Sequence, residues 1–252
     1  MLQEVMTSPG VIEFRDVPIP EIRDDQVLVK MMRLGICGSD IHVYHGKHPY
    51  TKYPVTQGHE VSGEIVQVGS AVKGLKVGQK VVLEPQVTCG KCYPCTHGKY
   101  NLCTELKVMG FQTTGAASEY FAVDASKVDV IPDSMTYDEA ALIEPLTIAL
   151  AAAEQAHISY GKSVAIMGAG GIGLMLVQLA RLAGASCVTV FDLVEEKCEL
   201  AKQLGADYAF DPRKEGALEE AMKVAGGAYD CVLEGTGVVS SAENALKLLA
   251  RN

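Results

Sequence analysis

SVAIMGAGGIG, residues 163–173, joins a short apolar run to the pattern Gly-x-Gly-x-x-Gly. Between a buried strand and a helix, this pattern is typical of a turn that binds a dinucleotide. Gly168 makes the tight turn, Gly170 lets the backbone approach a pyrophosphate at the helix N-terminus, and Gly173 allows the helix to pack closely on the strand. Glycine turns are common between strands and helices, so the pattern needs a second signal. The candidate cofactor-binding residues of the turn are Gly168, Gly170, Gly171, Ile172 and Gly173.

Asp192 supplies that second signal. It lies nineteen residues after Gly173, at the end of the next apolar run, residues 187–192. A carboxylate there accepts hydrogen bonds from the adenosine ribose hydroxyls and repels the 2′-phosphate of NADP. No arginine occurs in the next five residues, 193–197, so the sequence predicts NAD as the cofactor. A helix N-cap is the alternative role for Asp192, and it is compatible with cofactor binding.

The C-terminal part of the chain alternates apolar runs with helical patterns from Lys162 onward. Gly184 and Gly205 stand where helix ends favour a left-handed residue. We therefore predict a doubly wound parallel sheet of the Rossmann type over residues 151–252. A complete sheet of this type has six strands, so we expect a domain that is truncated at its C-terminus. The four strands that the sequence predicts are residues 163–167, 187–192, 208–210 and 230–234.

The N-terminal part, residues 1–150, is predicted to be a separate β-rich domain, with short runs broken by Gly, Pro and Asp. Near its end, Thr136-Tyr137-Asp138-Glu139 is typical of a capping box, and it opens an alanine-rich helical stretch. Pro145 is expected to kink or restart this helix. The predicted strands of this domain are residues 26–34, 61–68, 80–83 and 119–123.

Four cysteines lie close together in this domain, at Cys89, Cys92, Cys95 and Cys103. Thiolates this close can complete a tetrahedral zinc site, and the lobe at residues 88–106 has few apolar residues with which to fold otherwise. Disulfides and an iron–sulfur cluster are the alternatives. The bacterial cluster pattern needs its fourth cysteine three residues on and before a proline, which this spacing lacks. Disulfides need an oxidising compartment, and the N-terminus shows no signal peptide, so we predict structural zinc.

The composition, 48% hydrophobic and 21% charged over 252 residues, describes an ordinary globular protein. The net charge of -9 argues against a nucleic-acid partner, because phosphate binding needs an excess of Lys and Arg on one face. No apolar run is long enough to cross a bilayer, so we expect no membrane partner. Eight cysteines without a secretory signal predict a cytoplasmic protein whose cysteines are metal ligands or buried hydrophobes.

A second set of metal donors is spread over three segments. Cys37 in GICGSD, residues 35–40, and His59-Glu60 in the segment GHE offer a thiolate, an imidazole and a carboxylate. On spacing alone, a buried cysteine and a core histidine are the simpler account. The flanking glycines favour a shared site, because they let the side chains turn onto one point. Glu144 lies in an apolar stretch, where a carboxylate must be paired, protonated or ligating.

These motifs, in this order, resemble the medium-chain zinc-dependent alcohol dehydrogenases over the whole chain: Gly-x-Cys-Gly-Ser-Asp-x-His, Gly-His-Glu, the four-cysteine lobe and the glycine turn. The segment Ile143-Glu144-Pro145-Leu146 is similar to the sorbitol (polyol) and threonine dehydrogenase branch, in which a glutamate replaces a cysteine ligand of the ethanol-type enzymes. The resemblance implies a GroES-like catalytic domain followed by an NAD-binding domain, with one catalytic and one structural Zn²⁺ per chain.

The resemblance also assigns roles to single residues. Cys37 and His59 would hold the catalytic zinc, with Glu60, Glu144 or water completing its shell. Ser39 would accept the substrate's hydroxyl proton and pass it through the nicotinamide ribose to His42 near solvent. The alternative for His42 is an ordinary surface histidine.

The reaction implied is hydride transfer from a secondary alcohol, a polyol or a similar small hydroxylated metabolite, to NAD, which gives a ketone. Polyols, threonine-like amino alcohols, butanediol and sugar phosphates all remain open as substrates. One alternative function is a zinc-free reductase of the same superfamily, which would lack the donors at Cys37 and His59 and the cysteine lobe. The other is a non-catalytic zinc-binding protein.

Family members continue for roughly a hundred residues beyond the equivalent of Asn252 and supply the remaining strands. Those strands carry the usual subunit-pairing edge, so the resemblance implies a homo-oligomer, a dimer or tetramer, for full-length members, with less reason to expect one of this chain. They also hold the nicotinamide half of the cofactor. We therefore expect this chain to bind zinc, to hold NAD weakly and to turn over slowly or, as an inactive fragment, not at all.

Overall fold

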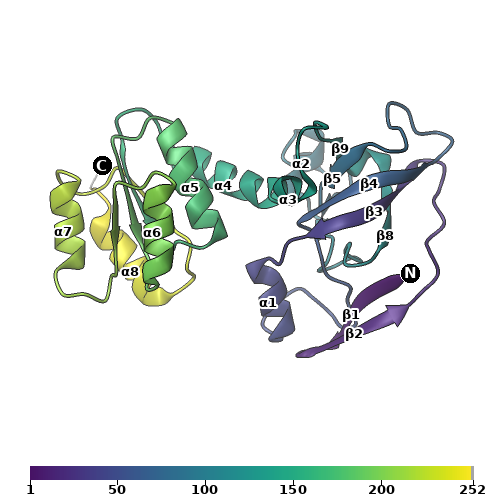
Figure 1. Ribbon diagram of the computed structural model, residues 1–252, viewed down its shortest axis with the longest axis horizontal. Coiled ribbons are helices and arrows are strands. Elements are labelled where there is room, and N and C mark those ends of the chain that lie inside the picture. Colours follow the sequence, from purple (N-terminus) through teal and green to yellow (C-terminus); the bar gives the residue numbers. More distant parts are fainter. Residues whose placement is uncertain (251–252) are drawn as a thin grey trace. The chain divides into compact units, whose positions relative to one another are not determined.

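The computed structural model describes residues 1–250, and their contacts divide the chain into two compact units, Met1–Glu144 and Pro145–Asn252. The boundary falls inside helix α4 (Ile143–Gln155), and each unit has hydrophobic clusters of its own. Figure 1 traces the first unit in purple to teal and the second from teal, in α4, through green to yellow. In the described part of the chain no helix is long and apolar enough to cross a membrane.

The first unit is built on a five-stranded antiparallel sheet in the order β8-β3-β4-β5-β9. Most of its core residues are β-branched, such as Val27 and Val29, both fully buried. The strands are β3 (Gln26–Leu34), β4 (Val61–Val68), β5 (Lys80–Leu83), β8 (Tyr120–Asp124) and β9 (Val128–Val130). The predictions for β3, β4 and β5 are confirmed to the residue, and β8 is shifted by one.

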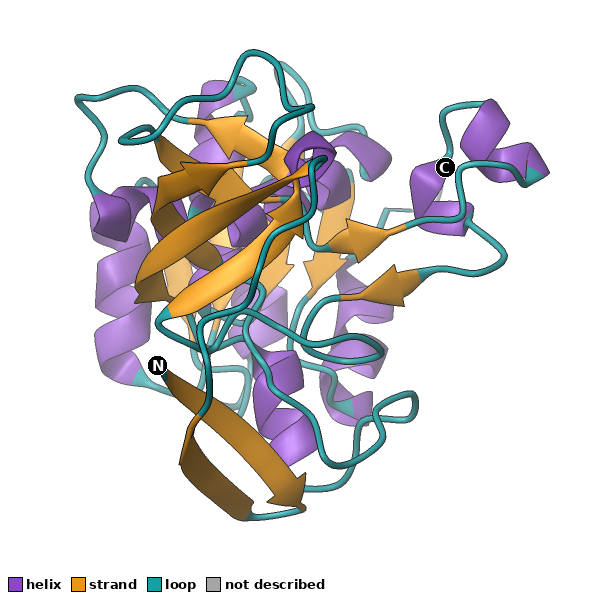
Figure 2. Ribbon diagram, turned by 90° about the vertical axis from the view of Figure 1, so that its right-hand side faces the viewer, coloured by secondary structure: helices purple, strands orange, loops and turns teal. Residues whose placement is uncertain are grey.

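Smaller elements surround this sheet. A separate hairpin, marked by the N-terminus in Figure 2, pairs β1 (Leu2–Ser8) with β2 (Val11–Asp16). Helix α1 (Gly38–Tyr44) follows β3. The cysteine lobe connects the two strands of a small antiparallel sheet. The elements of the lobe and its surroundings are β6 (Gln86–Val87), α2 (Tyr93–Thr96), η1 (Tyr100–Leu102), β7 (Lys107–Val108) and η2 (Ala125–Lys127).

The predicted capping box is confirmed at the start of helix α3 (Tyr137–Ala141). The Thr136 hydroxyl accepts a hydrogen bond from the Glu139 N–H at 3.2 Å, and the Glu139 carboxylate accepts one from the Thr136 N–H at 2.8 Å. The helical stretch stops at Ala141 and restarts as α4, with Pro145 in the first turn, as the sequence predicted.

The second unit is a four-stranded parallel sheet in the order β12-β11-β10-β13. Numbered along the unit, this order is 3-2-1-4, which is the arrangement of a doubly wound nucleotide-binding sheet. Gly184 and Gly205 have positive φ angles of 83° and 117°, and each follows a helix end as predicted. The elements are β10 (Ser163–Met167), α5 (Gly171–Leu182), β11 (Cys187–Phe191), α6 (Glu195–Gln203), β12 (Tyr208–Phe210), α7 (Ala217–Val224), β13 (Cys231–Glu234) and α8 (Val239–Leu248).

Candidate functional site

The structure brings together Cys37, His59 and Glu60, whose donor atoms all lie within 4.8 Å of one another. Cys37 is the N-cap of α1, and its sulfur accepts a hydrogen bond from the Ser39 N–H at 3.5 Å. His59 and Glu60 immediately precede β4. The two segments are held in register by a backbone hydrogen bond from the Gly35 N–H to the Glu60 carbonyl at 2.7 Å. A thiolate, an imidazole and a carboxylate therefore meet at one point, which is a donor set that suits Zn²⁺.

Two of the flanking glycines are required by this arrangement. A Cβ at Gly35 would come within 2.4 Å of a Glu60 carboxylate oxygen. Gly58 has a φ angle of 96°, and a Cβ there would lie 2.9 Å from the Ala117 backbone nitrogen. The same expectation for Gly38 is wrong: Gly38 is the first residue of α1, has no positive φ angle and faces open space.

Asp40 is a site residue that the sequence argument missed. It is buried, and its carboxylate accepts hydrogen bonds from the Cys37 N–H at 2.9 Å and from the Gln57 side-chain amide at 3.0 Å. An Asp40 oxygen also lies 3.8 Å from Nδ1 of His59, a buried atom without a hydrogen-bond partner among the described residues. Asp40 thus fixes the backbone of Cys37 and faces the ring of His59. Carboxylates often lie in this way behind histidines that bind a metal. The spacing Cys37-x-x-Asp40 is that of a capping box, and this pattern in the sequence could have indicated the role of Asp40.

The electrostatics of this site favour a bound cation. Burial raises the pKa of Cys37, Asp40 and Glu60 above their ordinary values. Burial, followed by the negative charges of Glu60 and Asp40, raises the pKa of Glu144 to about 7. Glu144 therefore lies near this site, although it is not among the donor atoms that converge. A divalent cation would offset this crowding of buried acidic groups, so the residues present fit zinc.

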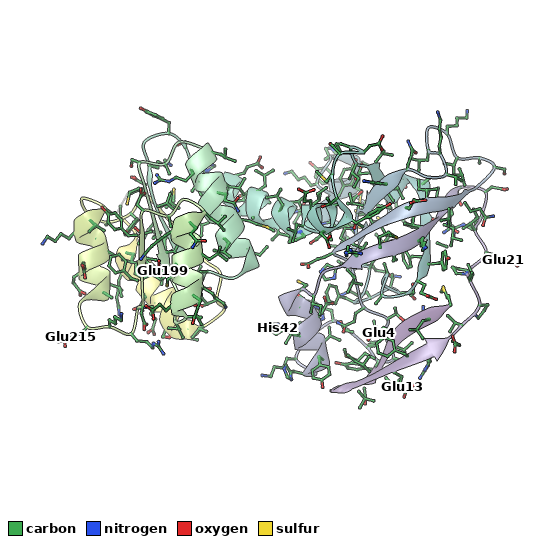
Figure 3. All side chains as sticks on the ribbon, viewed as in Figure 1. Glu4, Glu13, Glu21, His42, Glu199 and Glu215 are labelled. Carbon is green, nitrogen blue, oxygen red and sulfur yellow. The ribbon has the colours of Figure 1, made fainter. Side chains whose placement is uncertain are left out.

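Ser39 and His42 both lie on α1. Ser39 follows Gly38 in the first turn, two residues past Cys37, and His42 lies in the last turn. The His42 side chain is exposed, and Figure 3 labels it beside α1. This position suits proton exchange with solvent, and the relay between the two residues stays a prediction.

The four lobe cysteines also converge, with all sulfur atoms within 4.8 Å of one another. All eight cysteines of the chain are free, and the 3.4 Å between the sulfurs of Cys92 and Cys95 is far longer than the roughly 2.05 Å of a disulfide. Cys103 accepts hydrogen bonds from the backbone N–H groups of Cys89 and Glu105, at 3.3 and 3.4 Å. This geometry favours one shared metal ion over the disulfide alternative.

The electrostatic surroundings of the lobe sulfurs agree with a metal site. Hydrogen bonds from backbone N–H groups, with that of Thr104 the largest cause, lower the pKa of Cys92 to about 6. Similar N–H donors lower the pKa of Cys103, whereas burial and the neighbouring sulfurs raise that of Cys95 to about 12. Four thiols crowded together cannot all ionise without a cation, and zinc would let all four bind as thiolates.

The glycine turn has the geometry predicted for it. Gly168 adopts a φ angle of 101°, and Gly170 is the N-cap of α5. A Cβ at Gly173 would lie only 1.9 Å from the Gly168 carbonyl oxygen, so the helix packs against the turn as closely as expected. Gly171 and Ile172 are the first two residues of α5. The first-turn N–H groups of α5 are therefore free to face an anion.

Asp192 lies directly against this turn. Its carboxylate accepts hydrogen bonds from the Ala169 N–H at 2.8 Å and from the Val194 N–H at 2.9 Å. The alternative role as a helix N-cap is wrong, because α6 is capped by Val194. The contact with Ala169 joins the carboxylate at the end of β11 to the turn after β10, which are the two places where a dinucleotide is held in this fold.

Substituting Asp40 tests the donor arrangement. Asp40→Asn should weaken zinc at the Cys37 site by about 10–100-fold, because the amide is neutral and cannot accept both present hydrogen bonds and support the histidine. Competition with a chelator measures the affinity, and zinc in the cysteine lobe should be retained. Asp16→Asn, an exposed aspartate on β2, is the matched control. Equal zinc retention in both variants would contradict the role given to Asp40.

Comparison with known proteins agrees with both halves of the chain. Residues 23–133 match the family "Alcohol dehydrogenase GroES-like domain", and residues 171–252 match "Zinc-binding dehydrogenase". A sorbitol dehydrogenase from Bacillus subtilis is 39% identical over 257 residues, which cover 100% of this chain and 72% of that protein.

Two solved structures of similar proteins carry cofactors. A zinc-binding dehydrogenase from Sinorhizobium meliloti, bound to NADP, has a TM-score of 0.94 and 36% identity, and the match covers 98% of this chain and 73% of that one. An alcohol dehydrogenase from Escherichia coli CFT073, complexed with NADH, has a TM-score of 0.92 and 35% identity, covering 99% and 73%. The chain therefore belongs to the medium-chain zinc-dependent alcohol dehydrogenases, in their sorbitol and threonine dehydrogenase-like branch.

Proposed function

We propose that the protein oxidises a secondary alcohol to a ketone with NAD as hydride acceptor and zinc at the Cys37 site. The observation that carries this proposal is the convergence of Cys37, His59 and Glu60 in a chain that also has a dinucleotide turn joined to Asp192. The similarity to a sorbitol dehydrogenase supports a polyol, or another small hydroxylated metabolite, as the substrate. Which polyol is used depends on the side chains that line the substrate's path.

The chain's own residues divide the work in this proposal. Cys37 and His59 hold the zinc ion, with Glu60 or Glu144 available to complete its shell, and Asp40 keeps the donors in place. When bound, the ion supplies Lewis acidity, which lowers the pKa of the substrate hydroxyl. Ser39 accepts the hydroxyl proton, and His42, which is exposed, exchanges it with solvent.

In the second unit, the turn at Gly168–Gly173 supplies backbone N–H groups to the pyrophosphate of the cofactor at the start of α5. Asp192 accepts hydrogen bonds from the adenosine ribose hydroxyls. The hydrogen bond from the Ala169 N–H to this carboxylate ties the turn to the ribose site, so the chain itself positions the two parts of the cofactor site relative to each other.

A screen of secondary alcohols tests the function. Zinc-loaded protein is mixed with NAD and, in turn, with polyols, threonine, butanediol and polyol phosphates, and the absorbance of NADH is followed. We expect NADH to form with at least one substrate and to stop forming when the Cys37 zinc is removed. A protein that holds zinc yet forms no NADH with any of them would instead favour the non-catalytic zinc-binding function.

Substituting Asp192 tests the cofactor. Asp192→Ser removes the charge that repels a 2′-phosphate, so the preference for NAD over NADP should fall by about tenfold or more, on the scale of ~1–3 kcal/mol for a charge-assisted hydrogen bond. The ratio of kcat/KM for the two cofactors measures this preference. Glu199→Ala, an exposed acidic residue on α6, is the control and should leave the ratio unchanged. An unsubstituted protein that prefers NADP would contradict the assignment.

We also propose a cytoplasmic location, because eight free cysteines, four of them in the lobe, are stable in a reducing compartment. The partner that this function requires is a small alcohol. A homo-oligomer, dimer or tetramer, remains a prediction from the family for full-length members.

A further inference from the structure

We propose that Arg213 is a second determinant of cofactor choice, a guanidinium that stands ready to bind a 2′-phosphate and is kept from doing so by the charge of Asp192. This inference rests on the proposed function, because it takes Asp192 to be the residue that meets the adenosine ribose. It predicts that a single substitution at Asp192 would let this chain accept NADP.

The position of Arg213 follows from the pairing of two strands. The Asp192 N–H donates to the Phe210 carbonyl at 3.1 Å, so the ends of β11 and β12 lie side by side. Arg213 comes three residues after the end of β12, and its Nη2 donates to the Leu193 carbonyl at 3.0 Å. The guanidinium is thus fixed to the residue next to Asp192, at the carboxyl edge of the sheet where the ribose is bound in this fold.

Asp211 holds this guanidinium in place with two parallel hydrogen bonds, from Nε to Oδ1 at 2.9 Å and from Nη2 to Oδ2 at 2.8 Å. The Nη1 group makes none of the hydrogen bonds that the structure shows for Arg213, and the side chain is 63% exposed. An arginine has five N–H donors, so a positioned guanidinium with unused donors remains available to a phosphate.

The charges around Arg213 explain why this capacity is suppressed. Hydrogen bonds from Arg213 lower the pKa of Asp211 to about 2, so Asp211 is ionised. Burial is the largest cause of the raised pKa of the Cys198 thiol, and the negative charges of Asp192 and Asp211 add to it. The carboxylates of Asp192 and Asp211 and the guanidinium of Arg213 therefore lie at the same edge of the sheet. Lys214 adds a positive charge near Asp211. Removing the Asp192 charge leaves Asp211 as the ionised carboxylate beside Arg213, so a 2′-phosphate at this edge of the sheet would meet less repulsion.

Fluorescence titration with NADPH and NADH tests the proposal by binding alone, without turnover. We expect Asp192→Ser to gain NADPH affinity, and Asp192→Ser/Arg213→Gln to lose about tenfold of that affinity while NADH binding changes less than about twofold. Asp192→Ser/Asp211→Asn should bind NADPH more tightly than Asp192→Ser, because asparagine removes the negative charge beside the guanidinium while its amide oxygen can still accept the Arg213 Nε–H. Lys214→Gln in the same background is the control for general charge and should cost less than about threefold.

Equal NADPH affinity in Asp192→Ser and Asp192→Ser/Arg213→Gln would overturn the proposal, and so would a parallel loss of NADPH and NADH binding, which indicates a structural role. Arg213→Lys in the Asp192→Ser background, which keeps the charge but not the paired donors, should recover part of the lost affinity. Thermal melting of each variant shows that it is folded. If the unsubstituted protein binds neither cofactor, the proposed function itself is wrong.

Discussion

Replacing Cys37 with serine is expected to remove the catalytic zinc and to reduce alcohol oxidation on the order of 10³-fold or more, since a metal ion of this kind contributes several kcal/mol to the reaction. The protein should stay folded. Cys37 caps α1 through its side chain and through the Cys37 N–H, which donates to Asp40. Serine is a preferred N-cap residue and can make both contacts, so it removes the thiolate while keeping the helix start.

Zinc analysis measures the effect directly, because the count per chain should fall from two to one while the lobe keeps its ion. Cys231→Ser is the matched control. Cys231 is buried in the second unit, and its sulfur donates to the Ala156 carbonyl at 3.1 Å, a bond that a serine hydroxyl can replace. The control should keep both zinc ions and the original rate. A Cys37→Ser protein with two zinc ions and undiminished activity would show that Cys37 is not a ligand.

The Rossmann unit could be predicted almost to the residue because its signals are local. The central strands β10 and β11 are short apolar runs that are buried along their whole length, and each connection contains a glycine with a positive φ angle or a helix start. The hairpin of β1 and β2 could not be predicted from the sequence. The strand β1 is held by distant residues, through Glu4 N–H to the Ala117 carbonyl at 2.9 Å and Met6 N–H to the Val55 carbonyl at 2.8 Å. The strand β2 is exposed along its whole length, so it shows no alternation.

The donor residues of both metal sites were named from the sequence, because thiol, imidazole and carboxylate groups beside glycines are a chemical signal. The residues that hold these donors in place were not named from the sequence. Asp40 and Gln57 matter only because β-sheet pairing brings residue 57 next to residue 40. Arg213 was missed for a similar reason: a search for arginine along the five residues after Asp192 cannot see the neighbouring strand. Distance along the sequence does not identify spatial neighbours where two strands of the fold end at the same edge of a sheet.

Substituting one lobe cysteine should have the second large effect, on folding and not on chemistry. Cys92→Ser is expected to release the lobe zinc, and residues 88–106 should then become sensitive to protease. The lobe has only a four-residue helix and a three-residue 3₁₀ turn, and exposed side chains include Tyr93 and Leu102. Zinc binding supplies about 10–16 kcal/mol in small domains of this kind, far more than such short elements can provide.

Limited proteolysis together with zinc analysis measures this change, and His97→Ala is the matched control within the lobe. The His97 ring stacks on Tyr93 with 4.0 Å between centroids, so its removal deletes a ring contact of the lobe that involves none of the four cysteines. If zinc organises the lobe, His97→Ala keeps two zinc ions and resists protease, whereas Cys92→Ser does neither. The apolar side chains of the opened lobe should also promote aggregation. A Cys92→Ser protein that remains resistant and retains both ions would mean that packing, and not metal, holds these residues together.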